Sequence, residues 1–326
     1  MNRVENRIES NLPLQNYHFP MVLQEKVNQF IKRCLSSGFN VEMQLISFSN
    51  RNFKIQDSLG RLWVLRIPNE VSYRLCDQKQ EKVLLDWAYR EGFSLLNMHG
   101  YDEEEGYLLT PFLLGSSCTA ADFQNASHLK EALAILHRLH TTKMSPITAE
   151  FDPFKRYAVT AEKARQDGIC FPQEVESIVQ HLKSCLSQIP KEHFQKVPCH
   201  NDPNPENFFR QDARLYLHDW ELATCNDPMW DLALLSEFAE VDSEEILRLY
   251  PTSDPLANEK IVLFRAFIFL NTLVWAALES QKPSSSIPLD RVETMYHVFL
   301  AKIQEYTKSE LFETSLKKME EKEMAI

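Results

Sequence analysis

The feature that most constrains the fold is a change of pattern along the chain. Between residues 43 and 111 the sequence carries short runs rich in apolar and aromatic residues, a pattern typical of strands. Beyond Gly115 the apolar residues recur at helical spacing. We therefore predict an α+β fold with two lobes, a small antiparallel sheet lobe at the N-terminal end and a larger, mostly helical lobe after it. The pattern changes within residues 110–115, which divides the chain into lobes 1–112 and 113–326.

The sheet lobe is predicted from five short runs and two helical stretches. The strands are expected at residues 43–48, 53–56, 62–67, 94–100 and 107–111. Residues 57–60 read Asp-Ser-Leu-Gly and predict a hairpin turn between two of these strands. A helix is expected at residues 20–36 ahead of the sheet, and residues 74–91 form the one helix that we place within it.

The second lobe is predicted to be built from helices. They are expected at residues 125–140, 173–189, 243–250 and 289–312. The long apolar stretch 261–278 is interrupted by Arg265 and Asn271. Charged and amide side chains inside a membrane span are costly, so we interpret this stretch as a buried core helix.

Charge and cysteine content narrow the classes of function. The 326 residues carry a net charge of −11, which disfavours binding to nucleic acids or anionic membranes. The seven cysteines are widely spaced and contain no C-x-x-C, so we expect neither a disulfide framework nor a zinc site. The polar residues 1–11 do not resemble a signal peptide. A reducing, cytoplasmic setting is the expectation.

The most informative segment begins at His200 and reads HNDPNPEN. Asp202 and Asn207 lie five positions apart on this proline-rich loop, which is irregular but stiff. A short hairpin follows and is predicted to bring Asp219 back beside Asn207. Phosphoryl transfer needs a carboxylate for the attacking hydroxyl and oxygen ligands for Mg²⁺, and these three side chains supply both.

The spacing His-x-Asp-x-x-x-x-Asn is also that of the protein-kinase catalytic loop. Taken alone it fits an ordinary exposed turn equally well, because Asp, Asn and Pro gather in such turns. The later Asp219-Trp220-Glu221 favours the catalytic interpretation.

A wider set of motifs resembles a known family. The segments HND, PEN, DWE and NDPMWDLA, at residues 200–202, 205–207, 219–221 and 226–233, are similar to those of the bacterial choline kinases within the aminoglycoside phosphotransferase superfamily. The resemblance runs from about Leu45 to Trp275. It implies a protein-kinase-like fold, ATP and Mg²⁺ as cofactors, and transfer of phosphate to an alcohol.

The resemblance also implies roles for the residues of these motifs. Asp202 would be the catalytic base, and Asn207 and Asp219 would bind Mg²⁺. His200 would support the backbone of the loop, and Asp231 would cap the next helix and hydrogen-bond the catalytic loop. Two further positions are interpreted separately: Glu221 as a residue near the metals or the cationic head of the substrate, and His218 as a packing variant.

On the nucleotide side no glycine-rich loop is present. The resemblance offers the pair Ser49-Asn50 as its substitute. Arg66 lies within an apolar strand and is costly to bury unless paired, so we expect an ion pair with Glu81 on the following helix. A surface Arg66 on an edge strand is the alternative. At the hinge, the Pro111 carbonyl and the Leu113 N–H are expected to bind adenine.

The acceptor is the least determined part of the prediction. A quaternary ammonium is held by aromatic faces and carboxylates, and the candidates are Trp230, Trp275, Tyr250, Glu221 and Asp202. Choline is the first hypothesis. Thiamine, ethanolamine or an aminoglycoside is the second, and a pseudokinase or binding module is the third. We expect a monomer or homodimer that acts on a small, cationic alcohol.

Overall fold

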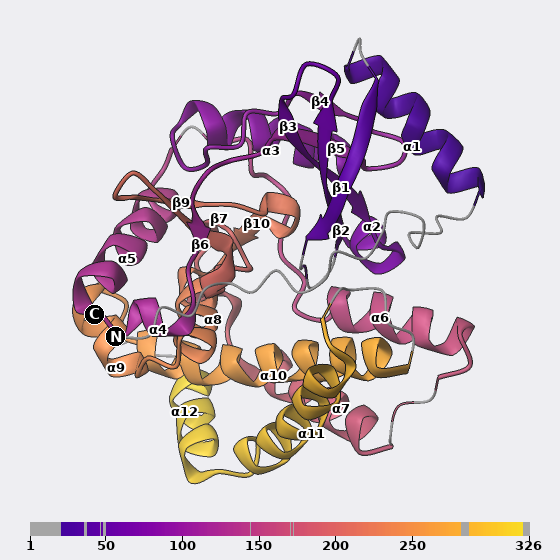
Figure 1. Cartoon of the computed structure of the whole chain (residues 1–326). Helices are drawn as coiled ribbons and strands as arrows, with labels where there is room; N and C mark the ends of the chain where they lie inside the picture. Colours follow the sequence, from indigo (N-terminus) through magenta and orange to yellow (C-terminus); the bar gives the residue numbers. More distant parts are fainter. Residues whose placement is uncertain are drawn as a thin grey trace, which may run out of the picture.

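The computed structural model describes residues 21–35, 38–45, 47, 50–143, 145–169, 171, 173–281 and 287–321. Its strands and helices separate into a sheet region near the N-terminal end and a larger helical region (Figure 1). The small antiparallel sheet and the larger helical part agree with the predicted α+β class.

The N-terminal sheet has five antiparallel strands in the order β1-β2-β3-β5-β4. The strands are β1 (Phe39–Leu45), β2 (Asn50–Asp57), β3 (Leu62–Pro68), β4 (Gly100–Tyr101) and β5 (Leu108–Pro111). The predicted hairpin turn is confirmed: Gly60 has φ 79° and its N–H donates to the Asp57 carbonyl at 2.9 Å. The strand expected at residues 94–100 is reduced to the two residues of β4.

Three helices accompany this sheet: the first confirms the helix expected at residues 20–36, and the other two replace the one helix expected at residues 74–91. They are α1 (Met21–Cys34), α2 (Glu70–Leu75) and α3 (Gln78–Arg90). The single helix expected at residues 74–91 is divided because Asp77 caps α3, accepting from the N–H groups of Lys79 and Gln80 at 3.1 and 3.0 Å. Phe30 and Ile31 of α1 pack with Ile55 and Leu65 of the sheet in one core.

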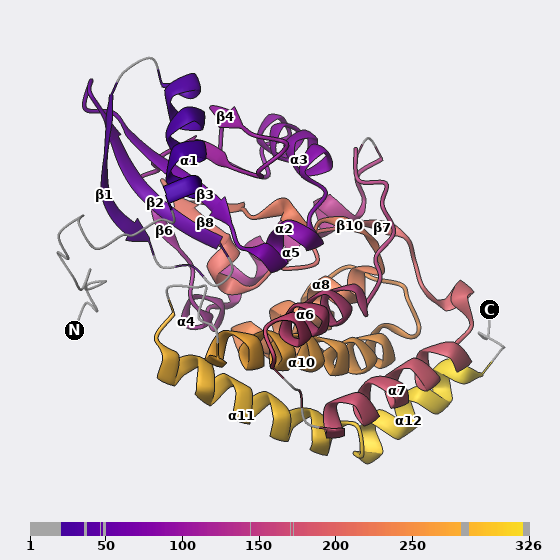
Figure 2. The same cartoon turned by 90° about the vertical axis from the view of Figure 1, so that its right-hand side faces the viewer.

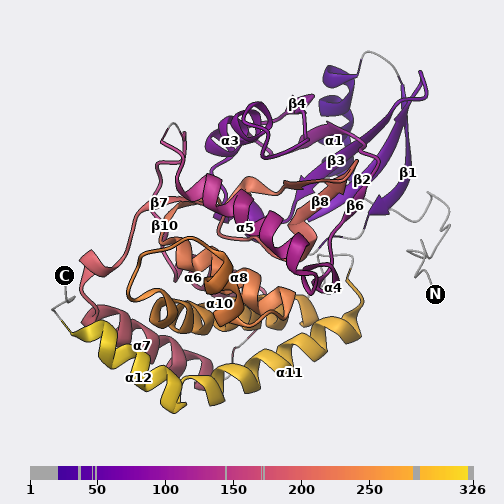
Figure 3. The same cartoon turned by 90° about the vertical axis from the view of Figure 1, so that its left-hand side faces the viewer.

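The helical part covers the rest of the chain. Its helices are α4 (Ala120–Phe123), α5 (Ala126–His140), α6 (Lys155–Gln166), α7 (Gln173–Gln188), α8 (Pro228–Ala239), α9 (Ser243–Leu249), α10 (Ala257–Gln281), α11 (Leu289–Tyr306) and α12 (Glu310–Glu320). The last two replace the single helix predicted at residues 289–312. In Figures 2 and 3, α7 lies beside α12 at the edge farthest from the sheet.

Short strands and turns lie between the sheet and the helices. The strands are β6 (Ser116–Ser117), β7 (Val197–Cys199), β8 (Phe208–Gln211), β9 (Arg214–Leu217) and β10 (Thr224–Asn226). The 3-10 turns are η2 (Lys191–His193), η3 (Pro205–Asn207) and η4 (Trp220–Leu222). The hairpin β8–β9 follows the predicted catalytic loop directly, so it brings the residues after the hairpin back to that loop.

Helix α10 forms the centre of the helical part, as predicted from its apolar stretch. Among the described residues it alone is long and apolar enough to cross a membrane, and 89% of its candidate span is buried inside the protein. It packs against α6, α8, α11 and α12. Arg265, which interrupts the stretch, donates to the Ser236 hydroxyl at 2.7 Å. These contacts are those of a core helix.

Candidate active site

The backbone of the predicted catalytic loop is hydrogen-bonded to Asp231, a fully buried residue in the first turn of α8. Its Oδ2 accepts from the His200 N–H at 2.9 Å and its Oδ1 from the Asn201 N–H at 2.7 Å. His140 Nε2 lies 2.9 Å from the same Oδ2. Asn201 has φ 63°, so these hydrogen bonds fix the loop in a conformation that few L-residues adopt. The next residue, Asp202, takes its position from this anchor.

The expectation that Asp231 caps the helix was wrong. Asp227 is the N-cap of α8, and its side chain accepts from the Met229 N–H at 3.0 Å. Asp227 also accepts from the Lys260 ammonium at 2.8 Å, which makes it part of a buried ion pair. Asp231 lies inside the helix, so its carboxylate faces the loop and not the helix end.

The segment 200–221, which we call the catalytic turn, brings Asp202, Asn207 and Asp219 close together. Asp202 lies in the loop, Asn207 ends η3 and Asp219 precedes η4. The Asn207 amide nitrogen donates to the Asp202 carbonyl at 2.8 Å and lies 3.4 Å from its carboxylate. This orientation leaves the Asn207 amide oxygen for another partner. The His218 N–H donates to the Asn207 carbonyl at 2.8 Å, which brings Asp219 back to the loop. Asp219 has φ 63°, a second strained residue at this site.

Arg66 and Glu81 form the predicted ion pair. Arg66 lies on β3 and its Nη2 donates to Glu81 on α3 at 2.7 Å. Both side chains are buried, and the opposing charges outweigh the burial that would lower the pKa of Arg66, so that pKa is raised. Arg66 Nη1 lies 3.8 Å from Asp219 and 3.7 Å from Glu221. The pair therefore faces the catalytic turn.

Asn50 is placed at the start of β2, buried, with its amide nitrogen donating to Glu221 at 2.9 Å. Its partner in the predicted phosphate-binding pair, Ser49, lies outside the described residues. Pro111 ends β5, where it pairs with Trp63, and Leu113 follows on the connection to β6. The phosphate role of Ser49 and Asn50 and the adenine role of Pro111 and Leu113 stay predictions.

The carboxylates of this turn share an environment that disfavours their charged forms. Burial raises the pKa of Asp202 to about 6. Burial, with the neighbouring charge of Asp219, raises the pKa of Glu221 to about 8. The pKa of Asp219, whose side chain is 30% exposed, is raised in the same direction by burial and by Asp202. A bound cation would relieve this mutual repulsion, so the donor set of Asp219 carboxylate and Asn207 amide oxygen fits Mg²⁺.

Two histidines support the turn from inside. The buried His200 places its Nε2 2.7 Å from the His218 carbonyl, and its ring packs edge-on against Trp220 at 5.0 Å. His218 Nδ1 lies 2.8 Å from the Ser94 hydroxyl, and its ring meets Phe209 at 5.3 Å. Burial lowers the pKa of His200 to about 4 and that of His218 to about 3. Both rings are therefore neutral packing groups near neutral pH.

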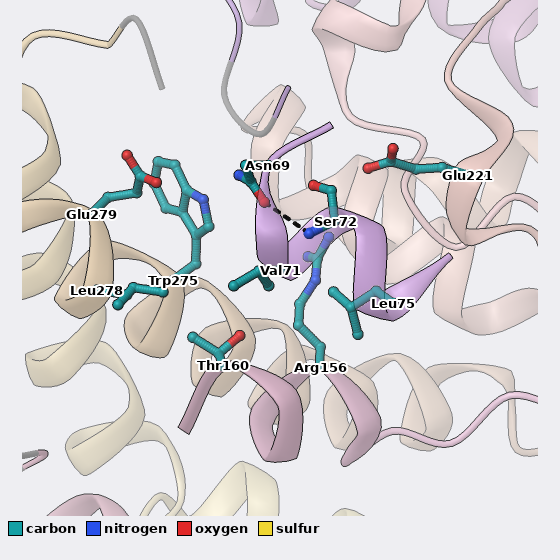
Figure 4. A pocket seen from close by; sticks show the side chains of 10 residues that line it. All are labelled: Asn69, Val71, Ser72, Leu75, Arg156, Thr160, Glu221, Trp275, Leu278 and Glu279. Carbon is teal, nitrogen blue, oxygen red and sulfur yellow. Dashed lines mark hydrogen bonds between the residues drawn. The ribbon is translucent and has the colours of Figure 1, made fainter. Parts of the chain in front are cut away.

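A small cavity lies beside Glu221, between α2, α6 and α10 (Figure 4). Its volume is about 30 Å³, room for about two water molecules. The lining residues are Asn69, Val71, Ser72, Leu75, Arg156, Thr160, Glu221, Trp275, Leu278 and Glu279. Two of the predicted acceptor residues, Glu221 and Trp275, thus meet in one cavity.

The other two aromatic candidates, Trp230 and Tyr250, do not line this cavity. Trp230 is 3% exposed, its ring packs on Phe151 at 4.4 Å, and its indole N–H donates to the Asn201 carbonyl at 3.3 Å. The Tyr250 hydroxyl lies 2.7 Å from His140 Nδ1 in the network under Asp231. Because α8 is buried on nearly all sides, its tryptophan faces the core and the loop backbone.

Sequence reasoning missed the residues that α6 and the end of α10 add to the cavity. Arg156 and Thr160 come from α6, for which no helix was predicted, and Glu279 comes from α10. A signal for α6 was present in the sequence, because Tyr157, Ala161 and Ala164, which the structure buries, recur at helical spacing.

A buried Arg66–Glu81 ion pair that faces Asp202, Asn207 and Asp219, with a cavity alongside, is the arrangement expected of a phosphotransferase with a kinase-like fold. The phosphotransferase enzyme family matches residues 43–253, more than half of the chain. The chain belongs to this family.

One named protein and two solved structures are similar to this chain. Protein LicA of Haemophilus influenzae is 31% identical over 201 residues, which is 60% of this chain and 73% of that protein. The crystal structure of choline kinase LicA from Streptococcus pneumoniae has a TM-score of 0.70 at 22% identity and covers 87% of this chain and 100% of its own. A structure of LicA in complex with AMP has a TM-score of 0.69 at 21% identity, covering 86% and 98%. These two structures share the fold of this chain.

Proposed function

We propose that this protein is an ATP-dependent kinase that transfers the γ-phosphoryl group to the hydroxyl of a small alcohol, with choline as the acceptor. The observation that carries the proposal is the meeting of Asp202, Asn207 and Asp219 beside the Arg66–Glu81 ion pair. Membership of the phosphotransferase family supports the reaction type. The choline kinase and AMP complex among the structural relatives support the acceptor and the nucleotide.

Asp202 is the proposed catalytic base. Its carboxylate accepts the proton of the acceptor hydroxyl while the oxygen of that hydroxyl forms a bond to the γ-phosphorus and the bond to the bridging oxygen of ADP breaks. The anchor at Asp231 holds Asp202 because it fixes the backbone of the two residues before it. The raised pKa of Asp202 makes it a stronger base than an exposed aspartate.

Asn207 and Asp219 are the proposed Mg²⁺ ligands, through one amide oxygen and one carboxylate. When bound, Mg²⁺ would neutralise charge on the phosphate oxygens. Arg66, oriented by Glu81, is proposed to bind phosphate, as are Ser49 and Asn50. The Pro111 carbonyl and Leu113 N–H are proposed to receive adenine where the lobes 1–112 and 113–326 join.

The cavity beside Glu221 is the proposed acceptor site. It offers an indole face at Trp275 and carboxylates at Glu221 and Glu279, the groups that hold an ammonium. One wall of this cavity, α2, is held to α6 by polar contacts, such as Glu70 with Lys163 at 2.7 Å, and by packing of Val71 on Ala164. Ethanolamine, thiamine or an aminoglycoside remains the alternative acceptor class.

We also propose a cytoplasmic setting. The six cysteines in the described part of the chain are free thiols, which supports a reducing compartment.

The test measures the turnover of a panel of alcohols with Mg·ATP, and the release of ADP is the readout. Choline is expected to be the fastest substrate and to give phosphocholine. Asp202→Ala is expected to abolish turnover and to leave ATP binding intact, whereas Glu206→Ala, an exposed carboxylate on the same turn, is expected to leave both unchanged. Turnover of another alcohol but not of choline would overturn the acceptor, and full activity of Asp202→Ala would overturn the base.

A further inference from the structure

Arg156 is a cation at the active site that the proposed function has not used. It lies in the first turn of α6, and in Figure 4 its side chain rises from that helix into the cavity, between Trp275 and Glu221. The helix itself is held in place: Lys155 donates to the Leu75 carbonyl at 3.0 Å, and Lys163 pairs with Glu70 at 2.7 Å. The guanidinium therefore extends from a fixed base.

The two arginines at this site differ in their partners. Arg66 forms an ion pair with Glu81, and its Nη2 lies 2.6 and 2.7 Å from the two carboxylate oxygens. No hydrogen bond or ion pair joins Arg156 to any residue that the structure describes. Its side chain is half-buried, so part of its hydration is lost without replacement. A guanidinium in that state has all five N–H donors available for an anion.

The position of Arg156 relative to the carboxylates indicates which anion it would meet. Its positive charge lowers the pKa of both Asp202 and Asp219, although burial raises each of them overall. Arg156 therefore lies within electrostatic reach of the proposed base and of a proposed metal ligand. The phosphoryl group in transfer must pass between these two residues, because Asp202 takes the acceptor proton and Asp219 lies on the metal side.

We propose that Arg156 is a catalytic residue that donates hydrogen bonds to the phosphoryl group during transfer. This inference rests on the proposed kinase function and adds a residue to it. The oxygens of the group in transfer carry charge that is shared between Mg²⁺ on the nucleotide side and Arg156 on the acceptor side. Arg156 exchanges no proton. The acceptor proton goes to Asp202, and the bond to the bridging oxygen leaves with ADP.

The arrangement also separates like charges. An ammonium head would bind at the Trp275 and Glu279 end of the cavity, whereas Arg156 serves the end that adjoins Glu221 and the catalytic turn. The acceptor then spans the cavity with its hydroxyl directed to Asp202. Arg156 is thus expected to affect the chemical step more than acceptor binding.

The experiment compares Arg156→Met and Arg156→Lys with Arg165→Met, which removes the same charge from the exposed face of α6. Arg156→Met is expected to lower kcat by about 10²–10³-fold, the usual effect of losing one donor to transition-state charge, with ADP affinity and acceptor KM within about threefold of wild type. Arg156→Lys is expected to recover part of kcat. Arg165→Met is expected to match wild type.

A second measurement does not depend on turnover. Binding of Mg·ADP with aluminium fluoride, which mimics the transferring phosphoryl group, is expected to weaken in Arg156→Met while Mg·ADP alone binds normally. Equal binding of the mimic in wild type and Arg156→Met, or a rise in acceptor KM at unchanged kcat, would overturn the role of Arg156. A wild-type protein that binds no Mg·ADP would instead overturn the kinase proposal, and the role of Arg156 with it.

Discussion

Replacing Asp231 by asparagine tests the anchor of the catalytic loop. The carboxylate accepts from two backbone N–H groups, at 2.9 Å from His200 and 2.7 Å from Asn201, through different oxygens. An asparagine has one acceptor oxygen, so either orientation leaves one of these buried N–H groups facing an NH₂ group. The shape of the side chain is otherwise unchanged.

The cost follows from these two hydrogen bonds. An unpaired buried N–H costs about 1–3 kcal/mol, and the remaining bond loses its charge assistance, about 1 kcal/mol more. The free energy of unfolding is therefore expected to fall by about 2–4 kcal/mol. A shift of the loop by about 1 Å would also displace Asp202, and misplacement on that scale costs about 10²-fold in kcat.

Urea unfolding followed by circular dichroism measures the first effect and steady-state ADP release measures the second. Asp242→Asn is the matched control. Asp242 is an exposed N-cap that accepts from the Glu244 N–H at 2.8 Å, and asparagine caps helices as well as aspartate does. If Asp231→Asn unfolds within about 0.5 kcal/mol of the control and keeps its kcat, the anchor has no such role.

Two further predictions concern acid stability and close packing. Because the pKa of His200 falls from 6.5 to about 4 on folding, the unfolded chain binds the extra proton between these values, and the contribution of His200 to stability declines as pH falls through that window. This contribution is about 2 kcal/mol between pH 7.5 and 5. The change in the free energy of unfolding between these two pH values, measured from urea midpoints, should therefore differ from wild type by that amount in His200→Gln and match wild type in His297→Gln, an exposed site. Gly115→Ala would place a methyl 2.5 Å from the Arg210 carbonyl, so the free energy of unfolding is expected to fall by about 1–3 kcal/mol and the thermal unfolding midpoint to fall with it. Gly38→Ala meets nothing within 4 Å and should leave the midpoint unchanged. Equal midpoints for the two variants would refute the clash.

Much of the fold was predictable because its signals are local. The hairpin turn at residues 57–60 and the core helix α10 follow from turn residues and apolar spacing within a few positions. The errors in the predicted helix boundaries have local causes as well. Caps at Asp77 and Ser309 divide stretches that read as single helices, since a side-chain cap competes with continued helix.

The candidate site was predictable only in the part that one segment encodes. Asp202, Asn207 and Asp219 belong to one loop and one hairpin, so their closeness follows from short-range geometry. Arg66 and Glu81 were expected to pair because a buried arginine in an apolar strand needs an anion, and they do. The catalytic roles of all five of these residues stay predictions.

By itself the sequence determined the α+β order of elements and the loop that carries the three oxygen-bearing side chains. The tertiary structure alone decided which other residues surround that loop. Trp230 packs in the core, Trp275 faces the cavity, and Arg156 enters from α6. The physical reason is that a helix buried on several sides shows no preferred face in its sequence, so the packing of distant elements decides which of its side chains line a cavity.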